Sequence, residues 1–339
     1  MNIQHGIHKN KPLRECQEIA YAFVSSSNKK FIGINAPTGS GKSIIGFDSI
    51  SSPFFYLCSS IHLEHQLQYD FPEASLLKGK GNYPCDIFET ADLCIMNPNK
   101  CALSCSYLGA KMAALNNPYS ILNFHYFLYA ANFAGFARKT RNIIVDEADS
   151  LDDILTGFIS FAFSMRQLKY LRLAFKPPFK KTVIGSFVSW MKLLAVKTRR
   201  ELTGIKGYVE DIDGNKYVSQ EELKLIKKHK QLANIDRKIR FLESQDLTDS
   251  NWVYYSNDNT VVVKPKWLNR DLADKFLFNY GNKFLFMSAT LPPKPVFCGL
   301  YGLKMSEVDY LELPHPFDKE NRKIVYRPRF SLTAKEMEG

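Results

Sequence analysis

Short apolar runs that end in small or polar residues recur along the chain and predict buried strands. They occupy residues 31–35 (FIGIN), 54–58 (FFYLC), 142–146 (NIIVD) and 283–287 (KFLFM). Helical spacing of apolar residues appears between several of these runs and also before the first, in residues 14–24 (RECQEIAYAFV). Strands that alternate with helices are typical of an α/β fold with a parallel sheet. We therefore expect an α/β core.

Two segments do not follow this alternation. Residues 79–106 are rich in Cys, Asn and Pro and show no clear periodicity. Residues 151–250 are rich in Leu, Ile, Lys and Glu, and residues 219–245 within them read as a charged amphipathic helix or a pair of helices. The pattern predicts one α/β domain that carries two insertions.

The first apolar run leads into a phosphate-binding pattern, APTGSGKS, in which Ala36 replaces the usual first glycine. Gly39 and Gly41 let backbone N–H groups close around a phosphate, and the following helix N-terminus favours an anion. Lys42 supplies a cation for the β- and γ-phosphates, and Ser43 supplies a hydroxyl for Mg²⁺. The expected phosphate-binding residues are Ala36, Pro37, Thr38, Gly39, Ser40, Gly41, Lys42 and Ser43.

A second acidic element, IIVDEAD, follows at residues 143–149. Asp146 ends an apolar strand and is expected to reach the metal through water, while Glu147 is placed to polarise the attacking water. By itself the DEAD sequence fits an acidic helix cap equally well. After a strand, and downstream of the phosphate loop, it predicts hydrolysis of a nucleoside triphosphate.

The composition narrows the cellular setting and the partners. The chain has 339 residues, 45% of them apolar, and a formal charge of +11. This charge fits either an acidic polymer as partner or an ordinary solvated surface. No secretory signal and no apolar run long enough to span a bilayer is visible. We expect a soluble, cytoplasmic protein with no membrane partner.

Four cysteines lie close together: Cys85, Cys94, Cys101 and Cys105. Thiolates suit zinc or an iron–sulfur cluster, although structural zinc sites usually pair their cysteines at closer spacing. The spacing alone leaves a cluster, zinc and unrelated thiols open. The other three cysteines, Cys16, Cys58 and Cys298, fall on apolar faces and are expected to be buried packing residues.

Together, the motifs resemble a known family. The order of APTGSGKS, VDEAD (145–149) and SATL (288–291) is similar to that in the first motor domain of superfamily 2 helicases. Arg14 and Gln17 resemble the R-x-x-Q element with which that family reads adenine.

The likeness is more specific around the cysteines. LLKGKGNYPC (76–85) and CSYLGAKMAAL (105–115) resemble the iron–sulfur insertion of the XPD/DinG helicases. SILNFHYFL (120–128) resembles the segment that returns to the motor domain, and residues 251–278 carry the family's Trp…Pro pattern. Three features depart from the family: DEAD replaces the usual DEAH, the cysteines are more closely spaced, and motifs IV to VI are missing.

The resemblance implies a RecA-like P-loop NTPase domain with a Cys-rich iron–sulfur insertion and a mainly helical arch. It implies ATP and Mg²⁺ as ligands, a 4Fe-4S cluster on the four cysteines, and Lys42, Asp146 and Glu147 as the catalytic residues. The expected segments are 1–77 (motor), 78–110 (iron–sulfur insertion), 111–150 (motor), 151–275 (arch) and 276–339 (end of the motor domain and start of the second).

By resemblance the function is ATP-dependent unwinding of DNA, moving 5′ to 3′ on single-stranded DNA and at forks, by a monomer. The compressed cysteine spacing and arch would suit a small family member in a bacterial or phage-infected cell. Because the second motor domain is missing, we expect a fragment with little ATPase activity of its own. The alternative is a module that binds nucleic acid, and ATP, without translocating.

Candidate contacts to the strand are basic runs and nearby aromatic residues. The runs are residues 175–181, 197–200 and 224–230, and near the cysteines the candidates are Lys78, Lys80, Tyr83 and Lys100. Such Lys/Arg runs usually lie on solvated helix faces, and only together, beside the helicase-like motifs and the charge of +11, do they indicate nucleic-acid binding. His125 is expected to be a hydrogen-bonded core residue, and Trp190, Trp252 and Trp267 are expected to be packing residues.

Overall fold

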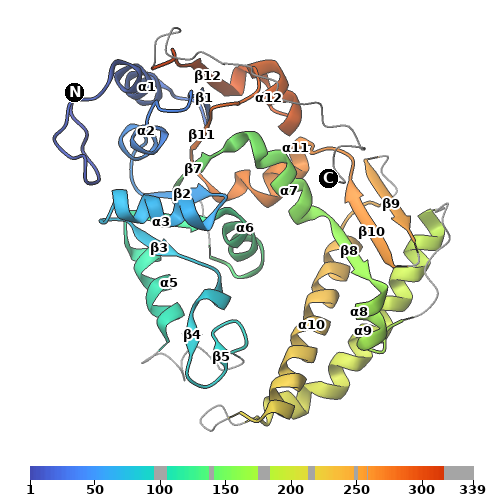
Figure 1. Ribbon diagram of the computed structural model, residues 1–339. Coiled ribbons are helices and arrows are strands. Elements are labelled where there is room, and N and C mark those ends of the chain that lie inside the picture. The colour runs from blue at the N-terminus through green and yellow to red at the C-terminus, as the bar shows by residue number, and fades with distance from the viewer. Residues whose placement is uncertain are drawn as a thin grey trace, which may run out of the picture.

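A seven-stranded parallel sheet forms the centre of the computed structural model, with the strand order β12-β1-β11-β7-β2-β6-β3 (Figure 1). The structure describes residues 1–94, 105–136, 141–174, 184–212, 218–247, 251–257 and 259–316. The strands are β1 (Phe31–Asn35), β2 (Phe54–Cys58), β3 (Ser75–Leu77), β6 (Tyr119–Asn123), β7 (Asn142–Asp146), β11 (Phe284–Ser288) and β12 (Val308–Glu312). All four predicted strands are confirmed.

Helices cover both faces of this sheet, which explains why its central strands read as continuous apolar runs. Every residue of β2 and β11 is buried. One face packs on α1 (Glu15–Ser26) and α2 (Lys42–Ser49), and the other mainly on α6 (Phe124–Phe133) and α7 (Leu151–Ile159). The remaining helices of this part are α3 (Ile61–Asp70), α5 (Ser106–Asn116), α11 (Arg270–Phe276) and α12 (Lys294–Tyr301). The fold is therefore α/β and RecA-like, as predicted.

The segment expected to form the arch contains two long helices, α9 (Ile184–Glu210) and α10 (Gln220–Glu243), which pack side by side (Figure 1). Residues 219–245, which fit one helix or two, contain the single helix α10. It begins at Ser219, whose hydroxyl accepts from the Glu222 N–H while the Glu222 carboxylate accepts from the Ser219 N–H. Arg199 and Lys228 form ion pairs between the two helices.

A three-stranded antiparallel sheet lies at the base of this pair and was not predicted. It consists of β8 (Phe161–Ser164), β10 (Thr260–Pro265) and β9 (Trp252–Ser256), in that order, with α8 (Met165–Tyr170) after β8. Its strands come from both ends of the segment and so close the long excursion of the chain. The segment is thus helical at its tip and mixed at its base.

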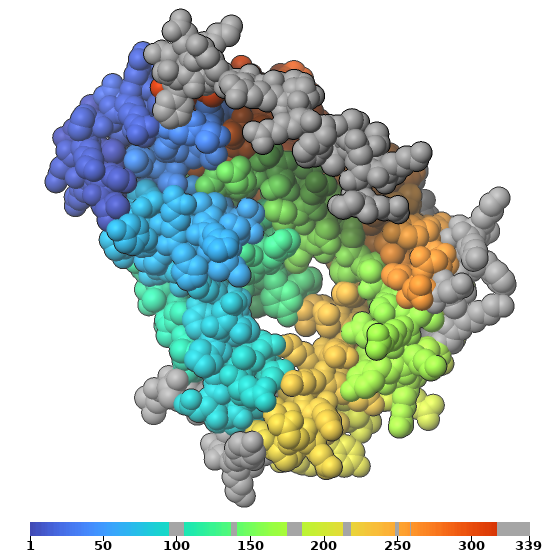
Figure 2. Space-filling view, viewed as in Figure 1, coloured from blue at the N-terminus to red at the C-terminus, as the bar shows by residue number. Residues whose placement is uncertain are grey.

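The Cys-rich segment contains the short strands β4 (Pro84–Cys85) and β5 (Glu89–Thr90), which pair antiparallel. It lies on the same side of the molecule as the tip of α10, and the Lys230 ammonium of α10 pairs with the Asp92 carboxylate. Figure 2 shows the molecule hollowed between this segment, the part that contains the seven-stranded sheet, and α10. Among the described residues, no helix is long and apolar enough to cross a membrane.

Candidate nucleotide and strand sites

A cavity of about 640 Å³ opens at the carboxyl ends of β1 and β7, the edge at which α/β sheets bind ligands. The phosphate loop and the acidic element, which are far apart in the sequence, both line it. Their residues in its wall are Thr38, Gly39, Gly41, Lys42, Ser43, Asp146 and Glu147.

The loop conformation depends on its glycines. Gly39 and Gly41 have φ of 87° and 81°, the left-handed region that side chains disfavour. A Cβ on Gly41 would lie 2.4 Å from the Gln17 side-chain nitrogen, so there is also no space for one. Gly41 is the N-cap of α2, and the first N–H groups of that helix are therefore directed at the loop.

Arg14 and Gln17 hold this loop from the start of α1. The Arg14 guanidinium donates to the Gly39 carbonyl at 2.8 Å, and the Gln17 amide donates to the Ser40 carbonyl at 3.1 Å. Both residues also line the cavity. The structure thus gives them a role in positioning the loop that the sequence did not suggest. Their expected contact with adenine stays a prediction.

Asp146 is the last residue of β7 and is only 5% exposed. Burial raises the pKa of its carboxyl above the ordinary 3.8, and a hydrogen bond from the Tyr56 hydroxyl at 2.7 Å opposes that rise. Tyr56 belongs to β2, a neighbour of β7 in the sheet. The sequence offered no signal for this contact, because it depends on the order of the strands.

Glu147 has φ of 50°, a conformation that residues other than glycine adopt rarely and that often marks a functional site. Its carboxylate lies 3.1 Å from the Lys42 ammonium, so the expected phosphate-binding cation and the expected water-polarising carboxylate form an ion pair. The two motifs therefore meet directly across the cavity.

Asp149, the last residue of DEAD, joins the acidic element to SATL. It accepts hydrogen bonds from the hydroxyls of Ser288 at 2.6 Å and Thr290 at 2.7 Å. Partial burial acts to raise the pKa of Asp149, but these two hydrogen bonds outweigh it and leave the pKa below 3.8. The last position of the motif is thus an anionic acceptor that connects β7 to β11.

Magnesium is the metal that this donor set fits. Ser43 and Asp146 present a hydroxyl and a carboxylate, the hard oxygen ligands that Mg²⁺ takes in nucleotide sites. Asp146 already accepts the N–H of Glu147 at 2.9 Å as well as the Tyr56 hydroxyl, which fixes its orientation. Ser43 and Asp146 are therefore the residues that would hold the ion.

Three of the four cysteines, Cys85, Cys94 and Cys105, belong to the described residues, which contain no metal site formed by them. Cys85 and Cys94 pack against the same small apolar cluster. Cys105 is the N-cap of α5, and the next residue, Ser106, donates to the Pro84 carbonyl at 3.2 Å. Cys101 lies outside the described residues. In the described ranges no group of three or more His, Cys, Asp or Glu residues is placed to hold a metal, so cluster ligation stays a prediction.

The remaining three cysteines are buried, as predicted, but only two of the three tryptophans are. Cys16, Cys58 and Cys298 are buried. Trp190 and Trp252 are buried too, but Trp267 is 55% exposed, so its prediction as a packing residue was wrong. Trp267 lies in the loop after β10, where Asn251 accepts from its backbone N–H and leaves the ring at the surface.

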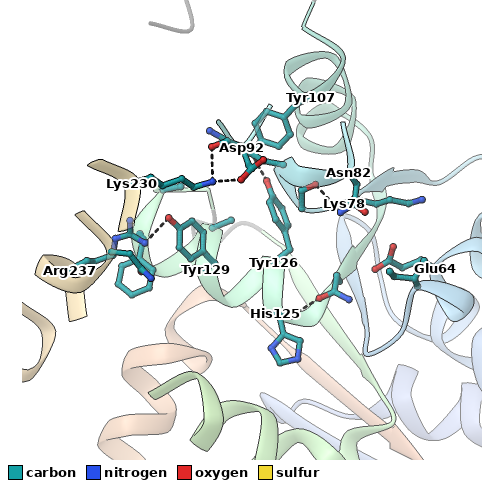
Figure 3. A pocket seen from close by; sticks show the side chains of 18 of the residues that line it. Glu64, Lys78, Asn82, Asp92, Tyr107, His125, Tyr126, Tyr129, Lys230 and Arg237 are labelled. Atoms are coloured by element: carbon teal, nitrogen blue, oxygen red, sulfur yellow. Dashed lines mark hydrogen bonds and ion pairs between the residues drawn. The ribbon is translucent and has the colours of Figure 1, made fainter. Parts of the chain in front are cut away.

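A larger cavity, of about 830 Å³, lies between the Cys-rich segment, α6 and α10; we call it the strand cavity (Figure 3). Its wall mixes cations with aromatic rings, namely Lys78, Lys80, Lys230 and Arg237 with Tyr107, Tyr126, Tyr129 and Phe133. His125 lies in this wall and is exposed, so its prediction as a core residue was wrong. The reason is its position in the first turn of α6, on the side away from the sheet.

The predicted basic residues do not all line the strand cavity. Lys230, of the run 224–230, reaches the strand cavity, as do Lys78 and Lys80. Arg199, of the run 197–200, is instead paired with the carboxylates of Asp236 and Glu243 and so joins the two long helices. The run 175–181 and Lys100 lie outside the described residues.

Comparison with known proteins supports the fold. No protein-family model and no curated protein sequence matches the chain. Among solved structures, an XPD helicase aligns over 89% of this chain with 16% identity and a TM-score of 0.53. A truncated XPD aligns over 89% of this chain and all of its own length, with 16% identity and a TM-score of 0.51.

These similarities define an XPD-like fold. This chain covers 62% of the XPD helicase, and at 16% identity the likeness extends to the fold alone.

Proposed function

We propose that the chain is a motor domain of an ATP-dependent DNA helicase of the XPD type. One observation carries this proposal: the phosphate loop and the acidic element line the same cavity, with Lys42 and Glu147 in contact. A cation at a helix N-terminus, next to a buried carboxylate and an exposed one, is the arrangement that phosphoryl transfer requires. The XPD-like fold supports the same class of activity.

In this proposal the phosphates of the bound nucleotide separate the ion pair between Lys42 and Glu147. The Lys42 ammonium turns from Glu147 to the β- and γ-phosphates, and Glu147 is then available to orient the attacking water. Asp146 and Ser43 hold Mg²⁺, which when bound neutralises charge on the phosphates. Burial disfavours the charge on Asp146, and a cation beside the carboxylate would offset that effect.

The strand cavity supplies the second part of the function. Single-stranded nucleic acid needs cations along its backbone and aromatic rings for its bases, and this cavity offers both. We propose that single-stranded DNA, including the single-stranded arm of a fork, passes here. The 5′-to-3′ direction follows from the resemblance.

Turnover by a variant of Glu147 tests this function. We expect the 339-residue chain to bind Mg-ATP and single-stranded DNA and to hydrolyse ATP slowly. Glu147→Gln should abolish the hydrolysis and keep ATP binding, because it removes only the group that orients water. Glu221→Gln, at an exposed position on α10, is the matched control. Failure to bind either ligand would contradict the proposal, and binding without any turnover would favour the non-translocating alternative.

We further propose that Cys85, Cys94, Cys101 and Cys105 hold a 4Fe-4S cluster that fixes the Cys-rich segment beside the strand cavity. Anaerobically prepared protein should contain iron and absorb broadly in the visible range, and Cys85→Ser should lose both signals. Cys298→Ser, in the buried core, should keep them. Zinc in place of iron, or iron that survives Cys85→Ser, would contradict the assignment.

A further inference from the structure

A smaller cavity, of about 180 Å³, opens beside the strand cavity between α6, α7 and α10; we call it the side cavity. The two cavities adjoin, because four residues line both of them: Tyr129, Phe133, Asn234 and Arg237. Phe158, Ser160, Phe161 and Lys238 line the side cavity alone.

The walls of the side cavity are aromatic and partly uncovered. Tyr129 is 44% exposed and Phe133 is 39% exposed, although both are large rings next to a cavity. The Phe133 ring lies 5.5 Å from that of Tyr129 and 5.8 Å from that of Phe158, centroid to centroid. Exposed aromatic rings of this kind are stabilised most when another flat ring stacks on them.

The size of the cavity limits what can enter. Pockets for drug-sized ligands measure roughly 300–1,000 Å³, well above this volume. An apolar cavity of about 150 Å³ is enough to hold benzene. The side cavity therefore suits one planar ring system rather than a whole cofactor or a peptide segment.

The edge formed by α10 is cationic. The Arg237 guanidinium lies 5.1 Å from the Tyr129 ring centroid, and the Lys238 ammonium lies 5.8 Å from that of Phe161. The neighbouring carboxylate, Asp236, is paired with Arg199 and Arg240 instead. Within the described residues, no carboxylate lies at ion-pair distance from Arg237 or Lys238. An anionic group joined to the planar ring would complement this edge.

We propose that the side cavity binds one unpaired nucleotide of the strand, with its base against Tyr129, Phe133 and Phe158 and its phosphate beside Arg237 and Lys238. This rests on the proposed function, because the strand must occupy the larger cavity. The bound base leaves the stack of its neighbours and adds affinity that depends on the base and not on the backbone.

Photocrosslinking tests the location directly. Oligothymidylate that carries 5-iododeoxyuridine is bound to the 339-residue chain and irradiated, and the adducts are mapped by mass spectrometry. We expect adducts on Phe158, an aromatic residue that lines the side cavity alone. Binding with adducts confined to rings that line the strand cavity would overturn this inference and leave the proposed function intact; these rings are Tyr107, Tyr126, Tyr129 and Phe133. Absence of any binding would overturn both.

A comparison of affinities tests the dependence on the base. The ligands are oligothymidylate and an abasic oligonucleotide of the same length. Phe158→Leu keeps the apolar volume but removes the flat ring, and should weaken oligothymidylate binding about tenfold while leaving abasic binding unchanged. Tyr69→Ala, an exposed aromatic position elsewhere, is the control. Equal effects of Phe158→Leu on both ligands would overturn the proposal.

Discussion

Burial disfavours the charge on Asp146, while one hydrogen bond from Tyr56 favours it. The balance of these two effects sets the pKa of Asp146 and so the pH above which the carboxylate is ionised and able to bind a cation. The group binds a metal only when ionised, so affinity for Mg-nucleotide is full above its pKa and is lost as the pH falls through it. Because that pKa is raised, the loss begins at higher pH than an ordinary aspartate would give.

Tyr56→Phe removes the hydrogen bond but keeps the ring in the core. The pKa of Asp146 should rise further, so the pH at which half of the Mg-nucleotide affinity is lost should shift upward. Titration of fluorescent Mg-nucleotide over a pH series measures this shift. Tyr310→Phe, which removes a hydroxyl bonded to the Leu291 and Pro292 carbonyls, should leave the profile unchanged. A downward shift in Tyr56→Phe would contradict the proposed balance.

Asp149→Ala should destabilise the fold, because it leaves the Ser288 and Thr290 hydroxyls without their acceptor. Ser288 is fully buried, so water does not replace the lost bond. We expect a loss of roughly 2 kcal/mol in the free energy of unfolding, measured by chemical denaturation. Asp149→Asn, which keeps one acceptor oxygen, should lose less. An unchanged denaturation midpoint in Asp149→Ala would refute the coupling.

Sequence reasoning found the residues that line the cavity at the carboxyl ends of β1 and β7, because a phosphate loop and an acidic strand end are local patterns. It missed Tyr56, whose contact with Asp146 exists only because β2 lies beside β7. It also misplaced His125 and Trp267, since the exposure of one side chain depends on what the rest of the chain leaves uncovered.

At the level of elements, local pattern predicted four of the seven strands of the main sheet, namely β1, β2, β7 and β11, and helical structure where α10 lies. The sheet of β8, β9 and β10 was missed for a physical reason. Its strands are short, and β8 pairs with β10 only after the two long helices intervene in the sequence. Residues 151–164 alone give no sign of a partner so far along the chain.

α10 links two parts of the molecule through single side chains. Lys230 pairs with Asp92 of the Cys-rich segment and donates to its carbonyl at 2.8 Å, and Arg237 donates to the Tyr129 hydroxyl at 2.7 Å. The ion pair with Lys230 acts to lower the pKa of Asp92, against the effect of burial. These contacts close the strand cavity on the side of α10.

Lys230→Ala should loosen the Cys-rich segment without unfolding the core. We expect faster amide hydrogen exchange in residues 80–93 and an unchanged rate in the central sheet, because the lost contacts are local. Lys227→Ala, at an exposed position on the same helix, is the control. Unchanged exchange in residues 80–93 would show that Lys230 does not hold this segment.

On the scale of the whole molecule, the chain carries a formal charge of +11, and three lysines and one arginine line the strand cavity together with the carboxylates of Glu64 and Asp92. If the strand binds there, its affinity should fall steeply with added salt, with a slope of roughly −0.7 for each phosphate neutralised.

Lys80→Ala should make that slope shallower by about 0.7, since it removes one contact to phosphate. Fluorescence anisotropy with labelled single-stranded DNA at several salt concentrations gives the slope. Lys9→Ala, in the exposed N-terminal segment, should not change it. Binding that is insensitive to salt would contradict a strand path through this cavity.

The central claim is that the phosphate loop and the acidic element hold one magnesium nucleotide between them. Calorimetric titration of ADP with and without Mg²⁺ tests it most directly. Lys42→Ala should weaken binding in both conditions, because its ammonium contacts phosphate. Asp146→Asn should weaken binding only when Mg²⁺ is present, because its carboxylate acts through the metal. Wild-type affinity in both variants, or a loss in Asp146→Asn that does not depend on Mg²⁺, would contradict one magnesium nucleotide held by both motifs.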